Sequence, residues 1–363
     1  MGVPATGDRG HAASASLRAG GGQDPSPPPR LSIGLPVYNG ETLLPGAIDA
    51  LLGQSYQDFE LIISDNASTD GTAEICRRYA EQDSRVRYIR QPHNIGMVAN
   101  HNFLAEVARG EFFKWASHDD LYARDFLQCC VDALDQHPEA ALAHAWCVLM
   151  DSGGEPVQLF RYPEATASLR AAIRFRSMLF DGKGDWTYAV FRTSVLRQTP
   201  LHGTYHGGDR TLIAEFALHG TLYQVPEWMF FRRDHPNRHL SAREWSIGFD
   251  PRRASRLRHP AVRLYAEYLW GFISAVRRSP LSAADKRECY GHLVRWLASR
   301  AVPAPHQGEV RESFRTQPLL YLLRRLAGLV LPGRDAPPAE QSFPPLTEIR
   351  IAALVPGGEQ SAL

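Results

Sequence analysis

The 363-residue sequence lacks any run of about 18 consecutive apolar residues, the length that a membrane-spanning helix requires. Its most hydrophobic late segment, PLLYLLRRLAGLVLP, is interrupted by Arg324 and Arg325. The first 29 residues lack the apolar block of a signal peptide, and they contain five prolines, six glycines and no aromatic residue. We therefore expect a chain that does not cross a membrane, with residues 1–29 as a disordered leader.

Cysteine is scarce and net charge is almost absent. The five cysteines include no CxxC pair, so nothing indicates a disulfide framework or a zinc site, and a reducing cytoplasm is the simplest compartment. Lys and Arg number 40 against 39 Asp and Glu, a net charge of +1 that argues against a nucleic-acid-binding role. No GxGxxG follows the first apolar run, which disfavours a dinucleotide-dependent dehydrogenase.

From Leu31 the sequence alternates between short apolar runs and helical patterns. The runs at 31–37, 59–65, 86–90 and 111–117 predict strands, and the spacing of apolar residues at 43–52, 75–79 and 97–108 predicts helices. This alternation predicts an α/β fold with a single Rossmann-like, mostly parallel sheet and helices on both faces. In such a sheet ligands bind beyond the carboxyl ends of the strands, so the polar loops there are the place to seek a site.

Later segments predict a less regular order. We expect a helix over about 122–136, a strand at ALAHAWCVLMD, a hairpin turn at Gly153-Gly154, a helix over 165–180, a short strand at 188–191, a helix over 210–218 and a strand at 221–233. From about residue 243 helical patterns take over. Residues 251–300 hold 11 Lys or Arg and three Asp or Glu, so we expect 244–363 to be a basic helical C-terminal region with a flexible tail.

Two groups of acidic residues follow predicted strands. Asp119 and Asp120 come directly after the fourth strand, and carboxylate oxygens are the ligands that Mg²⁺ or Mn²⁺ prefers when it also binds phosphates. The alternative is that this pair only caps the next helix. Asp65, after the second strand, either contributes to a site or forms a turn with Asn66, and the residues themselves leave both open.

The segments LSIGLPVYNGETLLPGAIDALLGQSYQDFELIISDNASTDGT and HNIGMVANHNFLAEVARGEFFKWASHDD resemble the nucleotide-diphospho-sugar transferase domain of family 2 glycosyltransferases. The resemblance extends over about residues 31–240. It implies a GT-A fold for residues 30–243 and transfer of a sugar from a nucleoside diphosphate with inversion at the anomeric carbon.

The resemblance also implies residue roles in donor binding. Asp65 would accept the ring N–H of uracil or thymine through a charge-assisted hydrogen bond, which cytosine cannot donate. The glycine of the third loop would allow its backbone to approach the nucleotide closely. The remaining donor contacts lie on the loops after the first and third strands: Pro36, Tyr38, Glu41, Asn94 and Gly96.

The metal motif departs from the family pattern. Family members usually carry Asp-x-Asp followed by another Asp, whereas this chain has Ser117-His118-Asp119-Asp120. Asp119 is the expected ligand for Mg²⁺ or Mn²⁺, with Asp120 beside it in the donor site. Ser117 would support the ribose or a metal-bound water, and the charge that it removes predicts modest metal affinity.

A transferase also needs a base for the acceptor hydroxyl. The resemblance assigns this role to Asp209, behind Gly207-Gly208, and the alternative is an ordinary helix N-cap. Arg232 and Arg233 resemble the closing segment whose basic groups reach the diphosphate, and His235 would be a further metal ligand or phosphate donor. The alternative for these three is a solvated charge cluster.

Two further features leave alternatives open. Trp186 and Tyr188 would stack on an acceptor sugar or lie in the core, and we favour the core. Leu319, Leu320, Leu322 and Leu323 would form an amphipathic helix on an anionic membrane or pack on the catalytic domain.

The sequence thus predicts a cytoplasmic glycosyltransferase, peripheral on the inner face of the cell membrane, that moves a sugar from a UDP- or dTDP-linked donor to a hydroxyl of a glycan or lipid-linked acceptor. A nucleotidyltransferase is one alternative, but PVYNGE offers no basic glycine-rich loop after the first strand. A non-catalytic nucleotide-sugar-binding module is the other, and Ser117 is its only support.

Overall fold

A computed structural model describes residues 27–180, 184–205, 207–234 and 260–301. These residues build one sheet of nine strands in the order β3-β2-β1-β4-β8-β6-β9-β5, with β7 paired to β6. The strands are β1 (Leu31–Val37), β2 (Phe59–Asp65), β3 (Val86–Arg90), β4 (Phe112–Trp115), β5 (Leu121–Tyr122), β6 (Ala140–Met150), β7 (Pro156–Phe160), β8 (Val190–Arg192) and β9 (Thr221–Arg233).

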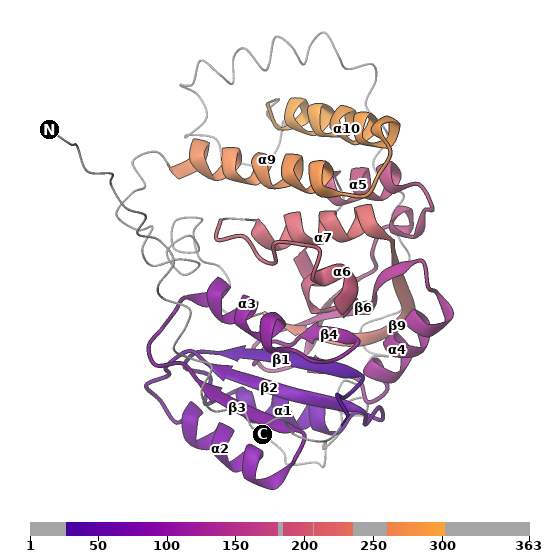
Figure 1. Cartoon of the computed structure of the whole chain (residues 1–363). Helices are drawn as coiled ribbons and strands as arrows, with labels where there is room; N and C mark the ends of the chain where they lie inside the picture. The colour runs from indigo at the N-terminus through magenta and orange to yellow at the C-terminus, as the bar shows by residue number, and fades with distance from the viewer. Residues whose placement is uncertain (1–26, 181–183, 206, 235–259, 302–363) are drawn as a thin grey trace, which may run out of the picture.

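Helices cover both faces of the sheet (Figure 1). Figure 1 shows α3 on one face of β1–β3 and α1 and α2 on the other, while α7, α9 and α10 form successive layers farther out. The α-helices are α1 (Leu44–Leu52), α2 (Thr72–Gln82), α3 (Met97–Val107), α4 (Phe126–Gln136), α5 (Ala171–Phe180), α6 (Thr193–Leu196), α7 (Gly208–His219), α9 (Pro260–Arg278) and α10 (Ala283–Ala301). Two 3₁₀ turns, η1 (Glu164–Ala167) and η2 (Gly184–Tyr188), flank α5.

The central strands are apolar because both of their faces are covered. Every residue of β1, β2 and β4 is buried, and the strand sequences LSIGLPV and FELIISD lack the alternation of a sheet with one wet face. The helices α1 and α4 face this core with stripes of Leu, Ile, Ala and Phe. The α/β fold and the mostly parallel sheet expected from the sequence are therefore confirmed.

The strand directions decide which loops lie together. β1 runs parallel to both β2 and β4, and β3 runs parallel to β2. β8 is antiparallel to β4 and to β6, and β9 is parallel to β6. Consequently β6 and β9 point the same way as β1–β4, and the carboxyl ends of all six strands share one edge. We call this edge the carboxyl edge.

Helix α7 begins at the carboxyl edge. It ends at His219, and the amide of Thr221 shortly after donates to the Glu139 carbonyl at the start of β6 with an N···O distance of 2.9 Å. Since β9 then returns toward the carboxyl edge alongside β6, α7 ends at the opposite edge, and Figure 1 shows the start of α7 on the side to which β1 points. Its first turn, with Asp209, is therefore at the same end of the sheet as the loops after β1, β2 and β4.

Two of the expected helices differ from the structure in more than the exact position of their ends. The expected helix over 122–136 begins only at Phe126, because Leu121 and Tyr122 pair with Phe231 and Phe230 of β9 as the short strand β5. The expected helix over 165–180 is divided into η1 and α5 by Ser168, whose backbone is extended at φ −58° and ψ 138°. The hairpin at Gly153-Gly154 joins β6 to β7, with Gly154 at φ +96°.

The two C-terminal helices pack on the core rather than stand apart from it. Phe272 of α9 is fully buried and meets Phe175 of α5 and Trp296 of α10 at ring distances of 6.0 and 5.5 Å. Arg278 of α9 forms a two-bond ion pair with the buried Glu215 of α7, at 2.9 and 2.8 Å. In the described ranges, neither these nor any other helix combines the length and apolar character needed to cross a bilayer. Residues 1–26 of the expected leader (1–29) and residues 302–363, including the leucines at 319–323, lie outside the described residues.

Candidate active site

The loops after β1 and β2 are bonded into a single wall of the carboxyl edge. Asn39, in the left-handed region at φ 53°, accepts the Thr69 N–H through Oδ1 at 2.8 Å. Glu41 accepts the Gly71 N–H through Oε2 at 2.7 Å. Pro36 lies in the buried end of β1, opposite Ser64 of β2, whereas the Tyr38 side chain is 46% exposed. Tyr38 and Glu41 are both exposed at this wall and Pro36 is buried, so Tyr38 can meet a ligand without rearrangement of the loop.

Asp65 is fully buried at the end of β2. One of its carboxylate oxygens accepts the Ser68 N–H at 2.8 Å, and the other accepts the Tyr88 hydroxyl at 2.9 Å and lies 3.7 Å from Arg90 Nε. Burial and the hydrogen bond to Asp65 raise the pKa of the Tyr88 hydroxyl, which stays a donor. A nucleobase that binds Asp65 must therefore donate its N–H to a carboxylate that already accepts hydrogen bonds from Ser68 and Tyr88.

Asn66 connects the β2 loop to the loop before α3. Its amide nitrogen donates to Asn94 Oδ1 at 3.0 Å, and its Oδ1 accepts the Ile95 N–H at 2.8 Å. Asn94 also accepts the Gly96 N–H at 2.9 Å, and Gly96 adopts φ +90°, which a side chain would strain. From the sequence Asn66 is expected only to form a turn, although its position directly after Asp65 indicates that it shapes this edge.

The Ser117–Asp120 loop lies against the loop after β1. A Cβ atom on Gly40 would lie 2.8 Å from the His118 ring, so the two loops are in van der Waals contact. The Ser117 hydroxyl donates to the Asp119 carboxylate, and both Asp119 and Asp120 are buried. Neither aspartate caps the following helix, because Asp125 occupies the N-cap of α4. The helix-cap alternative for this pair is therefore wrong.

Arg233 at the end of β9 is bonded to the acidic loop. Its backbone N–H donates to Asp120 Oδ1 at 3.0 Å, and its Nε donates to the Asp119 carbonyl at 3.2 Å. Arg232 is directed differently, with its guanidinium over the Phe160 ring of β7 at 5.8 Å. The two arginines treated alike in the sequence therefore have different surroundings, because successive strand residues point to opposite faces. His235 lies outside the described residues.

The chemistry of the acidic loop fits a hard divalent cation bound together with a phosphate. The described ranges contain no group of three His, Cys, Asp or Glu side chains that would hold a metal by themselves. Mg²⁺, however, is commonly held by one or two carboxylates, with substrate phosphates and water completing its ligands. Asp119 and Asp120 supply such carboxylates, and Ser117 supplies a hydroxyl.

Asp209 is half-buried in the first turn of α7. The N-cap residue of this helix is Gly207, and no side chain caps it, so the N-cap alternative for Asp209 is wrong. Gly207 adopts φ +80°, and a Cβ there would lie 2.8 Å from the Tyr268 ring of α9. A Cβ on Gly208 would lie 2.3 Å from the Gly203 carbonyl oxygen. The two glycines thus permit the close packing that presents Asp209.

Trp186 is a core residue, as the sequence analysis favoured. It is fully buried, and its ring packs on that of Tyr162 at 4.2 Å. Tyr188 is half-buried, with its ring 5.7 Å from that of Phe230, and its carbonyl accepts a hydrogen bond from Lys114 Nζ. Trp186 is therefore not available to stack on an acceptor.

Lys114 of β4 carries a fully buried amino group that the sequence did not single out. Its Nζ lies over the rings of Tyr122 and Phe126, at 4.2 and 4.7 Å from their centroids. Burial lowers the pKa of Lys114 to about 7. Its place in the strand run EFFKWAS was the available signal, because a lysine there must enter the core.

This burial predicts a dependence of stability on pH. Between about pH 7 and the ordinary lysine pKa, the unfolded chain binds a proton that folded Lys114 has released, so stability must rise with pH. From pH 7 to 8.5 we expect the free energy of unfolding to rise more steeply in the wild type than in Lys114→Met, by up to about 1.4 kcal/mol per pH unit. Urea titrations at several pH values measure both slopes. If the free energy of unfolding rose equally steeply with pH in the wild type and in Lys114→Met, the lowered pKa of Lys114 would be contradicted.

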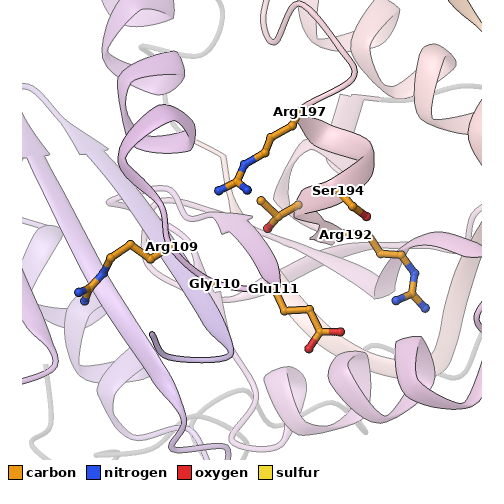
Figure 2. Close-up of a pocket in the computed structure, with 7 residues that line it drawn as sticks. Arg109, Gly110, Glu111, Arg192, Ser194 and Arg197 are labelled. Atoms are coloured by element: carbon orange, nitrogen blue, oxygen red, sulfur yellow. The ribbon is translucent and has the colours of Figure 1, made fainter. Parts of the chain in front are cut away.

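A hollow of about 260 Å³ lies at the opposite edge of the sheet (Figure 2). It is lined by the turn before β4 and the residues after β8, and Figure 2 shows Arg109 and Arg192 directed away from its centre. The Arg192 guanidinium donates to the carbonyls of Ala140 and Leu134 at 2.7 and 2.5 Å. Arg109 forms an ion pair with Glu60 and Glu111 forms one with Arg30, so these charged groups at the hollow are engaged within the protein as well.

Comparison with known proteins agrees with this geometry. The model of the family described as "Glycosyl transferase family 2" matches residues 32–201, which include the loops after β1, β2 and β4. Residues 32–201 belong to glycosyl transferase family 2. The matched domain therefore contains Asp65, Asp119 and Asp120 but ends before Asp209 and Arg233.

Curated relatives of this family 2 domain are similar over part of their length. An uncharacterized glycosyltransferase of Haemophilus influenzae is 34% identical over 131 residues, 36% of this chain and 52% of that protein. A GalNAc(5)-diNAcBac-PP-undecaprenol beta-1,3-glucosyltransferase of Campylobacter jejuni is 26% identical over 207 residues, 56% of this chain and 65% of that protein. The chain thus spans roughly half to two thirds of the length of these two relatives.

A solved structure shows the same fold. TarS 1-349 of S. aureus, in complex with UDP-GlcNAc, superposes with a TM-score of 0.55 at 16% identity, covering 74% of this chain and 73% of that one. The covered share exceeds the family match and includes part of the chain beyond residue 201. The family 2 domain therefore has the GT-A fold expected from the sequence.

Proposed function

We propose that this protein is an inverting glycosyltransferase that moves a sugar from a UDP- or dTDP-linked donor to a hydroxyl of a glycan or lipid-linked acceptor. The observation that carries the proposal is the shared carboxyl edge, where strand directions gather the loops of Asp65, Asp119 and Asp209. Ligands of open α/β sheets bind at this edge. The family 2 match over residues 32–201 adds independent support.

In this proposal the donor binds across the loops after β1, β2, β4 and β9. Asp65 accepts the ring N–H of the base, and Tyr38 lies over the nucleoside. Arg233 is assigned to the diphosphate because its guanidinium lies at the acidic loop, where a planar fork can hold phosphate oxygens. Asp119 and Asp120 would hold Mg²⁺ or Mn²⁺, which when bound neutralises charge on the departing diphosphate.

The transfer step needs a base on the acceptor side. Asp209 removes the proton of the acceptor hydroxyl while that oxygen forms a bond to the anomeric carbon, and the bond from this carbon to the diphosphate oxygen breaks. Attack from the face opposite the leaving group inverts the configuration. The position of Asp209 at the start of α7, on a segment separate from the donor loops, suits this division of roles.

A panel of donors tests the proposed function. We expect release of nucleoside diphosphate from UDP- or dTDP-sugars, and little from GDP-sugars, when the full chain is incubated with Mn²⁺ and an acceptor extract. No pyrophosphate should form from UTP and a sugar phosphate. Pyrophosphate release would indicate a nucleotidyltransferase instead, and UDP binding without any turnover would indicate a non-catalytic binding module.

Asp65→Asn tests how the base is recognised. The amide has the shape of the carboxylate but not its charge, so we expect the UDP dissociation constant to rise about tenfold, the value of one charge-assisted hydrogen bond. We expect discrimination between UDP and CDP to fall in parallel, by calorimetric titration. Asp132→Asn, at an exposed position on α4, is the matched control. Unchanged discrimination would limit Asp65 to shaping the loop.

We also propose contact with an anionic membrane surface through the C-terminal region. Trp270 of α9 is 62% exposed, and Arg277, about two turns further along the same helix, is exposed as well. An exposed tryptophan and an exposed arginine on one helix suit the boundary between headgroups and acyl chains. Such contact would bring a lipid-linked acceptor to the enzyme.

Flotation with liposomes of phosphatidylglycerol and phosphatidylcholine tests this contact. We expect the full chain to float with the liposomes at low salt and to lose most of this binding on Trp270→Glu. Leu169→Glu, at a position 84% exposed before α5, is the control and should float like the wild type. Failure of the wild type to float at low salt would contradict the proposal.

A further inference from the structure

One turn of α3, Asn100–Asn102, is hydrogen-bonded to three separate segments of the carboxyl edge. The Asn100 side chain exchanges two bonds with Ser64 of β2, in which Ser64 Oγ donates at 2.6 Å and Asn100 Nδ2 donates to the Ser64 carbonyl at 2.9 Å. The His101 carbonyl accepts the Trp115 indole N–H of β4 at 2.9 Å. Asn102 bonds to His202, a hundred residues further along the chain. This turn therefore connects the donor loops to the segment that leads into α7.

The bond between Asn102 and His202 has two parts. Asn102 Nδ2 donates to the His202 carbonyl, and the His202 N–H donates to Asn102 Oδ1, both at 3.0 Å. The Asn102 carboxamide thus pairs with both backbone groups of His202, the N–H and the carbonyl, as a residue of a neighbouring β-strand would. The His202 ring packs on Trp115 at 4.5 Å, and burial lowers its pKa to about 3, so the ring stays neutral there. Leu201, immediately before, is held at φ +61°.

The far end of the same segment is held by α7 and α9. The Tyr205 hydroxyl is hydrogen-bonded to Thr211 Oγ1 at 2.8 Å, and a Cβ on Gly271 of α9 would lie 2.3 Å from that hydroxyl. Gly207 and Gly208 follow, packed on Tyr268 and Gly203. The described part of the segment therefore runs between two fixed ends directly to Asp209.

We propose that Asn102 is a positioning residue for Asp209, and that it sets the placement of this carboxylate relative to the donor site. This inference rests on the proposed function, in which Asp209 is the base. The two side-chain hydrogen bonds of Asn102 described above go to His202, seven residues before Asp209, so its effect on Asp209 passes through the segment that follows His202. A catalytic base displaced by a fraction of its hydrogen-bond length loses rate without loss of donor binding.

The experiment compares wild type, Asn102→Ala, Asn102→Asp and the control Glu106→Ala, which alters an exposed position on the same helix. For Asn102→Ala we expect kcat to fall at least about tenfold while the donor KM and the UDP dissociation constant stay within about twofold. Hydrogen exchange of residues 199–205 should accelerate, because the His202 N–H loses its acceptor. Asn102→Asp keeps that acceptor and should recover part of both properties.

The outcomes separate this inference from the function on which it rests. An unchanged kcat in Asn102→Ala, a rise in donor KM that matches the fall in kcat/KM, or exchange at 199–205 that stays at the wild-type rate would overturn the positioning role alone. Absence of turnover in the wild type with every donor would overturn the proposed function, and this inference with it. A Glu106→Ala enzyme as slow as Asn102→Ala would overturn the specific role of Asn102 and attribute the loss to α3 as a whole.

Discussion

Replacing Asp209 with asparagine is expected to lower the rate of sugar transfer at saturating donor and acceptor by about 10³-fold, within the range that general-base catalysis contributes. The amide cannot accept the proton of the acceptor hydroxyl, yet its shape fits the first turn of α7 beside Gly207 and Gly208. We therefore expect the UDP dissociation constant to stay within about twofold of the wild-type value. Stopped assays of nucleoside diphosphate release, with calorimetric titration of UDP, measure both quantities.

Two control measurements test whether the loss of rate is specific to Asp209. Asp132→Asn, an identical change at an exposed position on α4, should leave the rate unaltered. Hydrolysis of the donor by water in the absence of acceptor should fall much less than transfer in Asp209→Asn, because it depends less on deprotonation of a bound hydroxyl. Transfer at near wild-type turnover in Asp209→Asn would show that another group is the base.

Replacing Asp119 with asparagine is expected to reduce kcat/KM for the donor by about 10²-fold or more and to weaken Mn²⁺ binding in the presence of UDP. The carboxylate supplies charge to a cation that shares its ligands with the diphosphate, and an amide supplies none. Paramagnetic resonance of free Mn²⁺ measures metal binding without turnover. Asp132→Asn is again the matched control, and equal Mn²⁺ binding by Asp119→Asn and wild type would contradict the assignment.

Ser117 offers a test in the opposite direction from Asp119→Asn, because a substitution there can add a carboxylate instead of removing one. Ser117 donates a hydrogen bond to Asp119, so its hydroxyl occupies one acceptor position of that carboxylate. Ser117→Asp restores the acidic residue that family members usually carry, and we expect tighter Mn²⁺ binding in the UDP complex. Weaker binding would mean that repulsion between the neighbouring carboxylates outweighs their attraction for the cation.

Much of the fold could be predicted because its first half follows local rules. The buried strands β1 and β2 and the edge strand β3 end at the residues where the sequence predicts their ends, and β9 spans the predicted TLYQVPEWMFFRR segment in full. Parallel strands place their following loops at a common edge, so the amino-acid pattern alone was enough to bring the loops of Asp65 and Asp119 together. The alternation of strands and helices thus predicted the direction of these strands and their order along the chain.

The remaining features depend on contacts that no local pattern encodes. The strand β5 has only two residues and exists because β9 pairs with it. Arg232 and Arg233 are neighbours in sequence but have different partners, and only the register of β9 against β6 decides which one meets the acidic loop. The bonds between Asn102 and His202 join residues a hundred positions apart, and an asparagine within a helical pattern gives no signal of them.

Hydrogen exchange with and without a nucleotide-sugar donor tests the central claim most directly, because it locates binding without any assumption about the reaction. In the presence of UDP-sugar and Mn²⁺ we predict protection in the peptides that contain residues 36–41, 64–71, 94–96 and 117–120 and the end of β9. The turn around Glu111 and the residues after Arg192, which line the hollow in Figure 2, should exchange as in the free protein. Protection at that hollow with none at the loops after β1, β2 and β4 would contradict a donor site at the carboxyl edge.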